Sequence, residues 1–117
     1  MRIYYFITYL IVVFITGCTD EHKIEPSIKI YKDLGSLQCG GGSIFPPDVM
    51  KKQLVSSGVQ VRSYSCGLDG LIHPYMCGIP DGRINIFEIE KNKLSQSQSL
   101  GFKDLSTLPN ATETQCL

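Results

Sequence analysis

Cysteine and histidine are the residues here with the widest chemistry, because their side chains bind metals and act as nucleophiles or bases. The chain has five cysteines and two histidines. Four of these side chains could together bind zinc: Cys39, Cys66, His73 and Cys77. Six residues separate Cys66 from His73 and three separate His73 from Cys77, which is not a recognised zinc spacing, and Cys-x-x-Cys is missing from the sequence. A zinc- or thiol-dependent enzyme using Cys66, His73 and Cys77 therefore stands as the alternative hypothesis, and it requires reduced cysteines.

The remaining cysteine, Cys18, ends an apolar segment at the amino terminus. A basic residue, Arg2, precedes thirteen mostly apolar residues, 3–15, whereas a membrane-spanning helix needs about 20. With Ile15-Thr16-Gly17-Cys18 at its end, the segment resembles the lipobox signal peptide of bacterial lipoproteins. The resemblance implies cleavage after Gly17, a diacylglycerol thioether on Cys18, and acylation of the new amino terminus by a chain such as palmitate.

The same resemblance implies a place in the cell. A lipoprotein is held at the cell envelope by its lipid, so one expected partner is the membrane itself. Thr19 follows the cysteine where Asp would favour retention at the inner membrane, so the class rule favours the outer membrane and a domain facing the periplasm. We expect residues 18–27 to form a polar tether and residues 28–117 to form one small domain.

Charge and motifs argue against several functions. Without Arg2, ten Lys and Arg face eleven Asp and Glu, and the longest basic run is Lys51-Lys52. Nucleic-acid binding is therefore not expected. Asp69 and His73 are close enough in sequence for acid–base chemistry, but two residues in a turn-rich segment do not predict a catalytic site. We expect no enzyme activity, no metal and no cofactor.

An exported location favours two disulfides among the four remaining cysteines: Cys39, Cys66, Cys77 and Cys116. The sequence does not fix their pairing. A Cys66–Cys77 bond would close a short hairpin loop, leaving Cys39–Cys116 to fasten the carboxy terminus, worth about 4 to 5 kcal/mol. Alternatively, Cys39 and Cys66 end two parallel neighbouring strands and bond to each other. We expect the first scheme, with geometry left to decide.

The connection between Cys66 and Cys77 contains an unusually apolar run, residues 71–76. If a disulfide clamps it, the loop presents side chains to a partner at a low ordering cost. The presented side chains would be His73, Tyr75 and Met76. The competing hypothesis is that Leu71, Ile72 and Tyr75 fold back over the core, which the burial tendency of aromatic residues favours.

The elements that must position these residues follow from hydrophobic periodicity and turn signals. Strands are expected over residues 28–32, 59–65 and 84–89, and the last is apolar on both faces, which indicates a central strand. Helices are expected over residues 47–57 and 92–100, and residues 105–117 are expected to be irregular. The expected fold is a small, disulfide-stapled α+β sheet in β-α-β-β-α order with both helices on one face. We therefore predict a non-enzymatic, lipid-anchored module that binds an unidentified protein, as an inhibitor, an immunity-like protein or an envelope accessory subunit.

Overall fold

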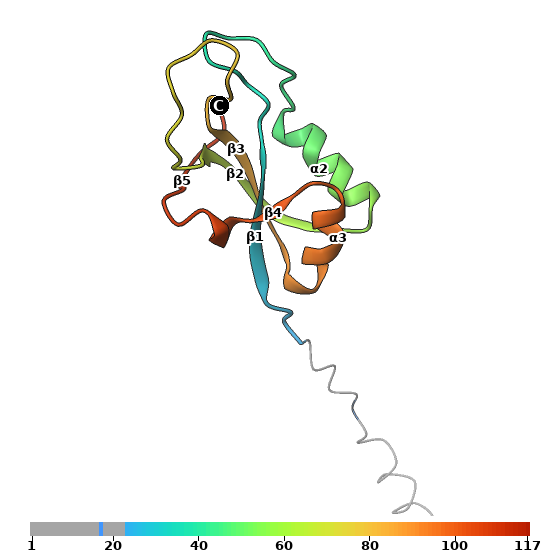
Figure 1. The fold of residues 1–117 in the computed structure, drawn as a ribbon. Coiled ribbons are helices and arrows are strands. Elements are labelled where there is room, and N and C mark those ends of the chain that lie inside the picture. The colour runs from blue at the N-terminus through green and yellow to red at the C-terminus, as the bar shows by residue number, and fades with distance from the viewer. Residues whose placement is uncertain (1–16, 18–22) are drawn as a thin grey trace, which may run out of the picture.

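The computed structural model describes residue 17 and residues 23–117. This part of the chain forms a five-stranded antiparallel sheet with two α-helices and two disulfides (Figure 1). The prediction of a small, disulfide-stapled α+β fold is confirmed. The expected lipidation site Cys18, and the expected signal segment apart from Gly17, lie outside the described residues. Among the residues described, no helix is both long enough and apolar enough to cross a bilayer.

The sheet is built around the strand that the sequence marks as central. The strands are β1 (Ser27–Asp33), β2 (Val61–Leu68), β3 (Arg83–Glu90), β4 (Lys103–Asp104) and β5 (Thr112–Thr114). Their spatial order is β4-β1-β3-β2-β5, and each neighbouring pair is antiparallel. Because β3 separates β1 from β2, the expectation that two parallel neighbouring strands carry Cys39 and Cys66 is wrong.

The helices begin and end where local signals place them. Helix α2 (Pro47–Ser56) has Pro47 in its first turn and Asp48 near its positive end, and Gly58 follows it with a φ of 83°, as helix ends commonly require. The expected second helix is divided into the 3₁₀ turn η2 (Lys91–Lys93) and the short α3 (Leu94–Ser99). The Ser97 hydroxyl donates to the Lys93 carbonyl, a local bond typical of serine in weak helices.

The two faces of the sheet carry separate apolar clusters, because successive side chains of β3 alternate between faces. One face carries the larger cluster: Ile30, Met50, Leu54, Val59, Phe87, Ile89 and Phe102. Helix α2 supplies Met50 and Leu54 to it, and Leu94 and Leu100 at the ends of α3 pack against it, so both helices cover this face. The opposite face carries the smaller cluster: Tyr31, Ile84, Ile86 and Leu108.

The carboxy-terminal segment is more ordered than the sequence indicates. Residues 105–117, expected to be irregular, contain the 3₁₀ turn η3 (Leu105–Thr107) and strand β5. Leu108 is buried in the smaller cluster, and Leu105 and Ala111 pack beside it. The segment therefore covers the sheet face that the helices leave open, and β4 and β5 extend the order beyond the expected β-α-β-β-α.

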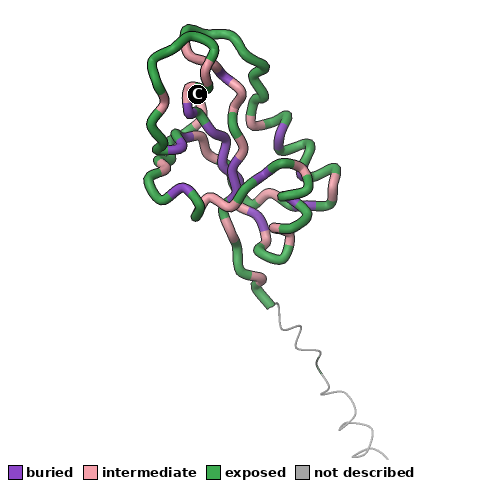
Figure 2. Tube along the Cα trace, in the orientation of Figure 1, coloured by how far each residue is buried: buried purple, intermediate pink, exposed green. Residues whose placement is uncertain are grey.

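The antiparallel register places two long loops together at one end of the sheet. Asp33 pairs with Ile84 and Leu68 pairs with Arg83, so β1 and β2 end where β3 begins. The loops 34–46 and 69–82 leave from this end, which we call the distal end. Residues 23–26 enter β1 at the opposite end (Figure 1). Buried positions concentrate along the sheet, whereas the distal end is mostly exposed (Figure 2).

Candidate functional site

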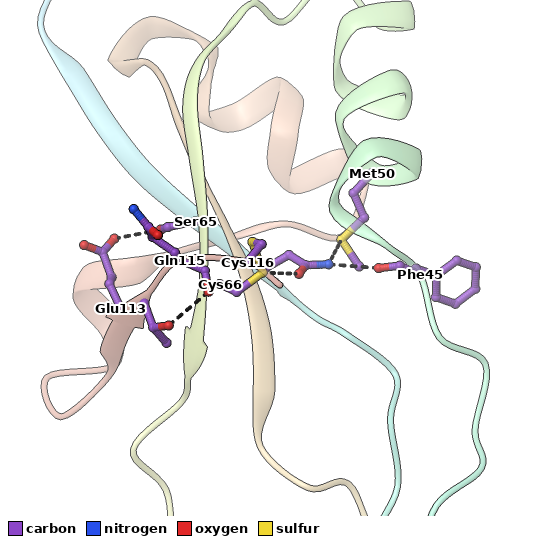
Figure 3. The surroundings of a disulfide bond; sticks show 9 residues. Phe45, Met50, Ser65, Cys66, Glu113, Gln115 and Cys116 are labelled. Carbon is purple, nitrogen blue, oxygen red and sulfur yellow. Dashed lines mark hydrogen bonds between the residues drawn. A yellow bond between two sulfur atoms is a disulfide. The ribbon is translucent and has the colours of Figure 1, made fainter.

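The disulfides join different cysteines from those expected. Cys39 bonds to Cys77 and Cys66 bonds to Cys116, with Cα–Cα distances of 5.1 and 5.0 Å. Figure 3 shows the second of these bonds. Both schemes considered from the sequence are therefore wrong. The reason is the path of loop 69–82: β2 continues past Cys66 to Leu68, and the loop then crosses to loop 34–46 instead of returning directly.

The second half of loop 69–82 is fastened to loop 34–46. The Gln38 amide donates to the Ile79 carbonyl at 2.8 Å, and the Asp81 amide donates to the Ser36 carbonyl at 3.2 Å. The Ser36 hydroxyl also donates to Asp81 Oδ1 at 2.7 Å. Together with the Cys39–Cys77 bond, these contacts hold residues 77–81 in place.

Asp81 is held in its charged form by these neighbours. Partial burial acts to raise the pKa of Asp81, but the Ser36 hydroxyl, the Arg83 amide and the Arg83 guanidinium outweigh it, and the pKa is lowered from its usual value of 3.8. The Arg83 amide donates to Asp81 Oδ1 at 3.1 Å, and Arg83 Nε lies 3.5 Å from Oδ2. The carboxylate therefore links both loops of the distal end to the start of β3.

The first half of loop 69–82 is fixed by Asp69 and His73. His73 Nε2 lies 2.7 Å from Asp69 Oδ2 and 3.0 Å from Oδ1, while the Leu71 amide donates to Oδ1 at 2.9 Å. The Asp69 amide donates to the Gly82 carbonyl, which closes the base of the loop. Asp69 is buried and the His73 side chain is 21% exposed. Of the three residues expected to face a partner, His73 is thus turned inward and acts as a fastening.

Four apolar side chains remain exposed on the same loop, and we call them the loop tip: Leu71, Ile72, Tyr75 and Met76. Ile72 is 98% exposed and Tyr75 is 99% exposed. The hypothesis that Leu71, Ile72 and Tyr75 cap the core is therefore wrong, because Leu108 from the carboxy-terminal segment already occupies that face. Tyr75 and Met76 have the exposure that a partner-binding role requires.

A small cavity lined by both polar and apolar side chains lies beside the fastened base of the loop. Its volume is about 330 Å³, and its lining includes Asp69, His73, Asp81 and Lys103. Within residues 17 and 23–117, however, no three His, Cys, Asp or Glu side chains are grouped so that they could hold a metal ion. Cys66 and Cys77 belong to different disulfides, so the thiols required by the zinc- or thiol-enzyme hypothesis are oxidised in this structure.

Asn85, which is not among the residues predicted from the sequence, is fully buried in β3 beside the Cys66–Cys116 disulfide. Its Nδ2 donates to the Phe45 carbonyl at 2.8 Å and contacts Met50 Sδ at 3.3 Å. Figure 3 shows Phe45 and Met50 on one side of the disulfide and Glu113 on the other. A single amide inside the apolar run Ile84-Asn85-Ile86-Phe87 was the available signal, because a buried polar side chain needs a partner.

Comparison with protein-family models finds no match, and neither do comparisons with curated proteins and with solved structures. Function is therefore inferred from the geometry of the distal end. That geometry combines a covalently fastened base, an inward-facing His73, and an apolar tip open to solvent.

Proposed function

We propose that this chain is an exported, lipid-anchored module that binds another protein through its loop tip and has no catalytic role of its own. The observation that carries the proposal is the nearly complete exposure of Ile72 and Tyr75 on a loop whose base is fixed. Covering exposed apolar surface with a partner contributes roughly 25 cal/mol per Å² to the free energy of binding. Aromatic and methionine side chains are also enriched at the centres of protein interfaces.

The fixed base supports this proposal energetically. A loop that is ordered before binding loses less conformational freedom when its partner arrives. The Cys39–Cys77 bond and the Asp69–His73 pair restrain the two halves of the loop separately. Only residues between His73 and Cys77 lie outside both restraints, and the Met76 amide still donates to the Pro74 carbonyl there.

The direction of the loop tip supports a protein partner over the anchoring membrane. The distal end lies across the length of β1 from residues 23–26, and a seven-residue strand is about 20 Å long. A lipid on Cys18 would therefore hold the opposite end of the domain toward the membrane. In this orientation Ile72 and Tyr75 face the aqueous compartment, where a secreted or periplasmic protein could reach them.

The disulfides support an exported location, because such bonds persist in oxidising compartments. The finer proposal is an outer-membrane lipoprotein facing the periplasm that acts as an inhibitor, an immunity-like protein or an envelope accessory subunit. These roles share one requirement, a surface that recognises a folded protein. A zinc- or thiol-dependent enzyme is not favoured, since it would require both disulfides to open.

Site-specific photo-crosslinking in cells tests the proposal. A photoreactive amino acid replaces Ile72 or Tyr75 in the full chain, and Val55, an apolar residue of α2 that is 54% exposed, serves as the control position. We expect one protein to be crosslinked from both loop positions and not from Val55. The same protein should fail to crosslink from position 72 when Tyr75→Ser is also present.

Two results would overturn the protein-binding proposal. Crosslinking of lipid from positions 72 and 75 would assign the loop tip to a membrane. Equal, diffuse crosslinking from positions 55, 72 and 75 would show that the tip is no more selective than any other exposed surface.

A further inference from the structure

The Cys66–Cys116 disulfide lies against a buried polar atom that it cannot satisfy. Asn85 is 0% exposed, and its Oδ1 lies 3.5 Å from Cys66 Sγ. A sulfur atom in a disulfide carries no hydrogen, so it cannot donate to this oxygen. The described residues give Asn85 Oδ1 no other donor, while Nδ2 is held by the Phe45 carbonyl, which fixes the orientation of the amide.

Reduction would supply the missing donor. A Cys66 thiol at the same position carries one hydrogen. Because sulfur is larger than oxygen or nitrogen, this thiol can donate a hydrogen bond to Asn85 Oδ1 over the observed distance of 3.5 Å. A buried acceptor that gains a donor is stabilised, which shifts an equilibrium by about fivefold. Asn85 therefore favours the open state of this bond more than an apolar residue at the same position would.

The segment that this bond holds has few other attachments. Cys116 is the next-to-last residue, and all three residues of β5 are exposed. Apart from its short pairing with β2, the segment is held by Glu113, which accepts from Lys29 Nζ at 2.8 Å and from the Ser65 hydroxyl at 3.4 Å. The other disulfide differs, because backbone hydrogen bonds between residues 36–38 and 78–81 also join its two loops.

We propose that Cys66–Cys116 is a thiol–disulfide exchange site whose opening by a dithiol reductant releases the carboxy-terminal segment Thr112–Leu117 from the sheet. The site does not depend on the protein-binding role of the loop tip. Asn85 is a positioning residue in this proposal, since it acts through the Cys66 thiol.

The exchange balances in two steps. A thiolate of the reductant attacks Cys116 Sγ in the exposed segment, which forms a mixed disulfide, and Cys66 leaves as a thiolate that takes up a proton. The second thiolate of the reductant then attacks the reductant's first sulfur, which is bonded to Cys116 Sγ in the mixed disulfide. Cys116 leaves as a thiolate and is protonated. The reductant becomes a disulfide, and the protein gains two electrons and two protons.

Opening would also change a larger apolar cavity. Its volume is about 500 Å³, and residues 114–117 form one wall while Ile44, Pro46 and Leu68 lie on the others. Release of residues 114–117 would uncover this cavity and the edge of β2 that β5 now pairs. The exchange site therefore controls access to a second surface, separate from the loop tip.

The test titrates the full chain with reduced and oxidised dithiothreitol and traps each state by alkylation. Peptide masses then give the opening equilibrium of each disulfide, and Cys39–Cys77 serves as the internal reference in the same molecule. We expect Asn85→Leu to make opening of Cys66–Cys116 less favourable by about fivefold or more, with Cys39–Cys77 unchanged. The lost bond to the Phe45 carbonyl is missing in both redox states, so it cancels in this comparison.

The matched control is Asn92→Leu in η2, where the side chain is exposed, and it should move neither equilibrium. An Asn85→Leu chain whose two equilibria keep their wild-type ratio would overturn the role of Asn85. Hydrogen exchange of the reduced wild-type chain tests release without a variant. Amides of residues 112–114 should exchange faster while those of β3 stay protected, and unchanged exchange at residues 112–114 would overturn the release.

If Asn85→Leu does not fold, the S–H stretching band of the reduced wild-type chain gives the same answer. Cys116→Ser assigns the bands. The Cys66 band should lie at lower frequency than the Cys116 band, as expected for a thiol that donates a hydrogen bond. Coincident bands would contradict the proposed contact.

Discussion

His73 Nε2 lies 2.7 Å from Asp69 Oδ2, four residues earlier in the chain. Gly82 packs against this pair so closely that an added Cβ would lie 2.8 Å from the His73 ring and 3.0 Å from Asp69 Oδ1. A polar, tightly packed base therefore supports the apolar residues that follow, and several measurable consequences depend on it.

Gly82→Ala should destabilise the fold more than a matched glycine substitution in the same loop. Gly82 and Gly78 have φ values of 83° and 86°, so alanine is strained at both positions, by roughly 1–2 kcal/mol. Among the described residues, a Cβ at Gly78 meets nothing within 4 Å, so only Gly82→Ala adds a collision with His73. Urea denaturation should show a free energy of unfolding lower for Gly82→Ala than for Gly78→Ala by about 1 kcal/mol or more. Equal values would mean that the His73 ring moves aside without cost.

Polar substitution at the loop tip should affect binding and not stability. Ile72→Ser and Tyr75→Ser remove side chains that are almost fully exposed, so the free energy of unfolding should stay within about 0.5 kcal/mol of wild type. Ile86→Ala, in contrast, empties a position in β3 that is 1% exposed, and should cost about 2–5 kcal/mol. Thermal unfolding measured beside the crosslinking assay separates the two effects. A large loss of stability in Tyr75→Ser would contradict its exposed position.

Removing Cys39–Cys77 should impair binding although the loop tip itself is unchanged. The bond spans 38 residues, and its loss through Cys39→Ser with Cys77→Ser should cost about 4 kcal/mol by chain entropy. At a temperature where the variant remains folded, hydrogen exchange should be faster in loop 69–82. Crosslinking from position 72 should weaken in the same sample, because the loop must then be ordered on binding. Undiminished crosslinking would remove the argument from a preformed loop.

Stability should fall in acid partly through Asp81. Its pKa is lower in the folded chain than its ordinary value of 3.8, so it binds protons more tightly when unfolded. Its contribution is thus present above about pH 4 and is lost as the pH falls through the folded pKa. Ser36→Ala removes one of the groups that lower this pKa, so the free energy of unfolding should fall less in acid for this variant than for the wild type. Unfolding measured between about pH 2 and 6 tests this; Ser106→Ala is the control, and coincident curves for the two variants would contradict the role of Ser36.

Lipidation should depend on Cys18 alone. In cells given a labelled palmitate analogue, the wild-type chain should carry the label and sediment with membranes, and Cys18→Ser should do neither. Sedimentation should follow the label, because an acyl chain adds about 0.8 kcal/mol of membrane affinity per buried methylene. Mass spectrometry of the mature amino terminus should show cleavage after Gly17. Label retained by Cys18→Ser would refute the lipoprotein proposal.

The parts of the fold predicted correctly are those that local signals determine. Strand β3 follows from its closely spaced apolar residues, Ile84, Ile86, Phe87 and Ile89, and α2 follows from Pro47, Asp48 and Gly58. The cysteine pairing depends instead on where a fourteen-residue connection crosses the molecule, which no local pattern determines. Strand β5 is a Thr-Glu-Thr segment without an apolar face, so only its partner β2 makes it a strand.

The sequence identifies the apolar loop but does not predict which way its side chains face. The apolar run in residues 71–76 identified the loop, yet whether its side chains face solvent or the core depends on Leu108, more than 30 residues later. His73 was grouped with the exposed residues although its spacing from Asp69 allows the contact that turns it inward. The role of Asn85 does not follow from its local sequence, because it depends on contact with Cys66 on the neighbouring strand.

The two disulfides interleave along the chain, in the order Cys39, Cys66, Cys77, Cys116. A chain that crosses a membrane with its amino end first presents Cys39 and Cys66 to the oxidising machinery before either native partner has arrived. Oxidation in order of appearance joins these two wrongly, so correct maturation requires either delayed oxidation or an isomerase that reshuffles the bond. Under the proposed export, we expect the yield of native protein to depend on the cell's capacity for disulfide repair as well as on the stability of the fold.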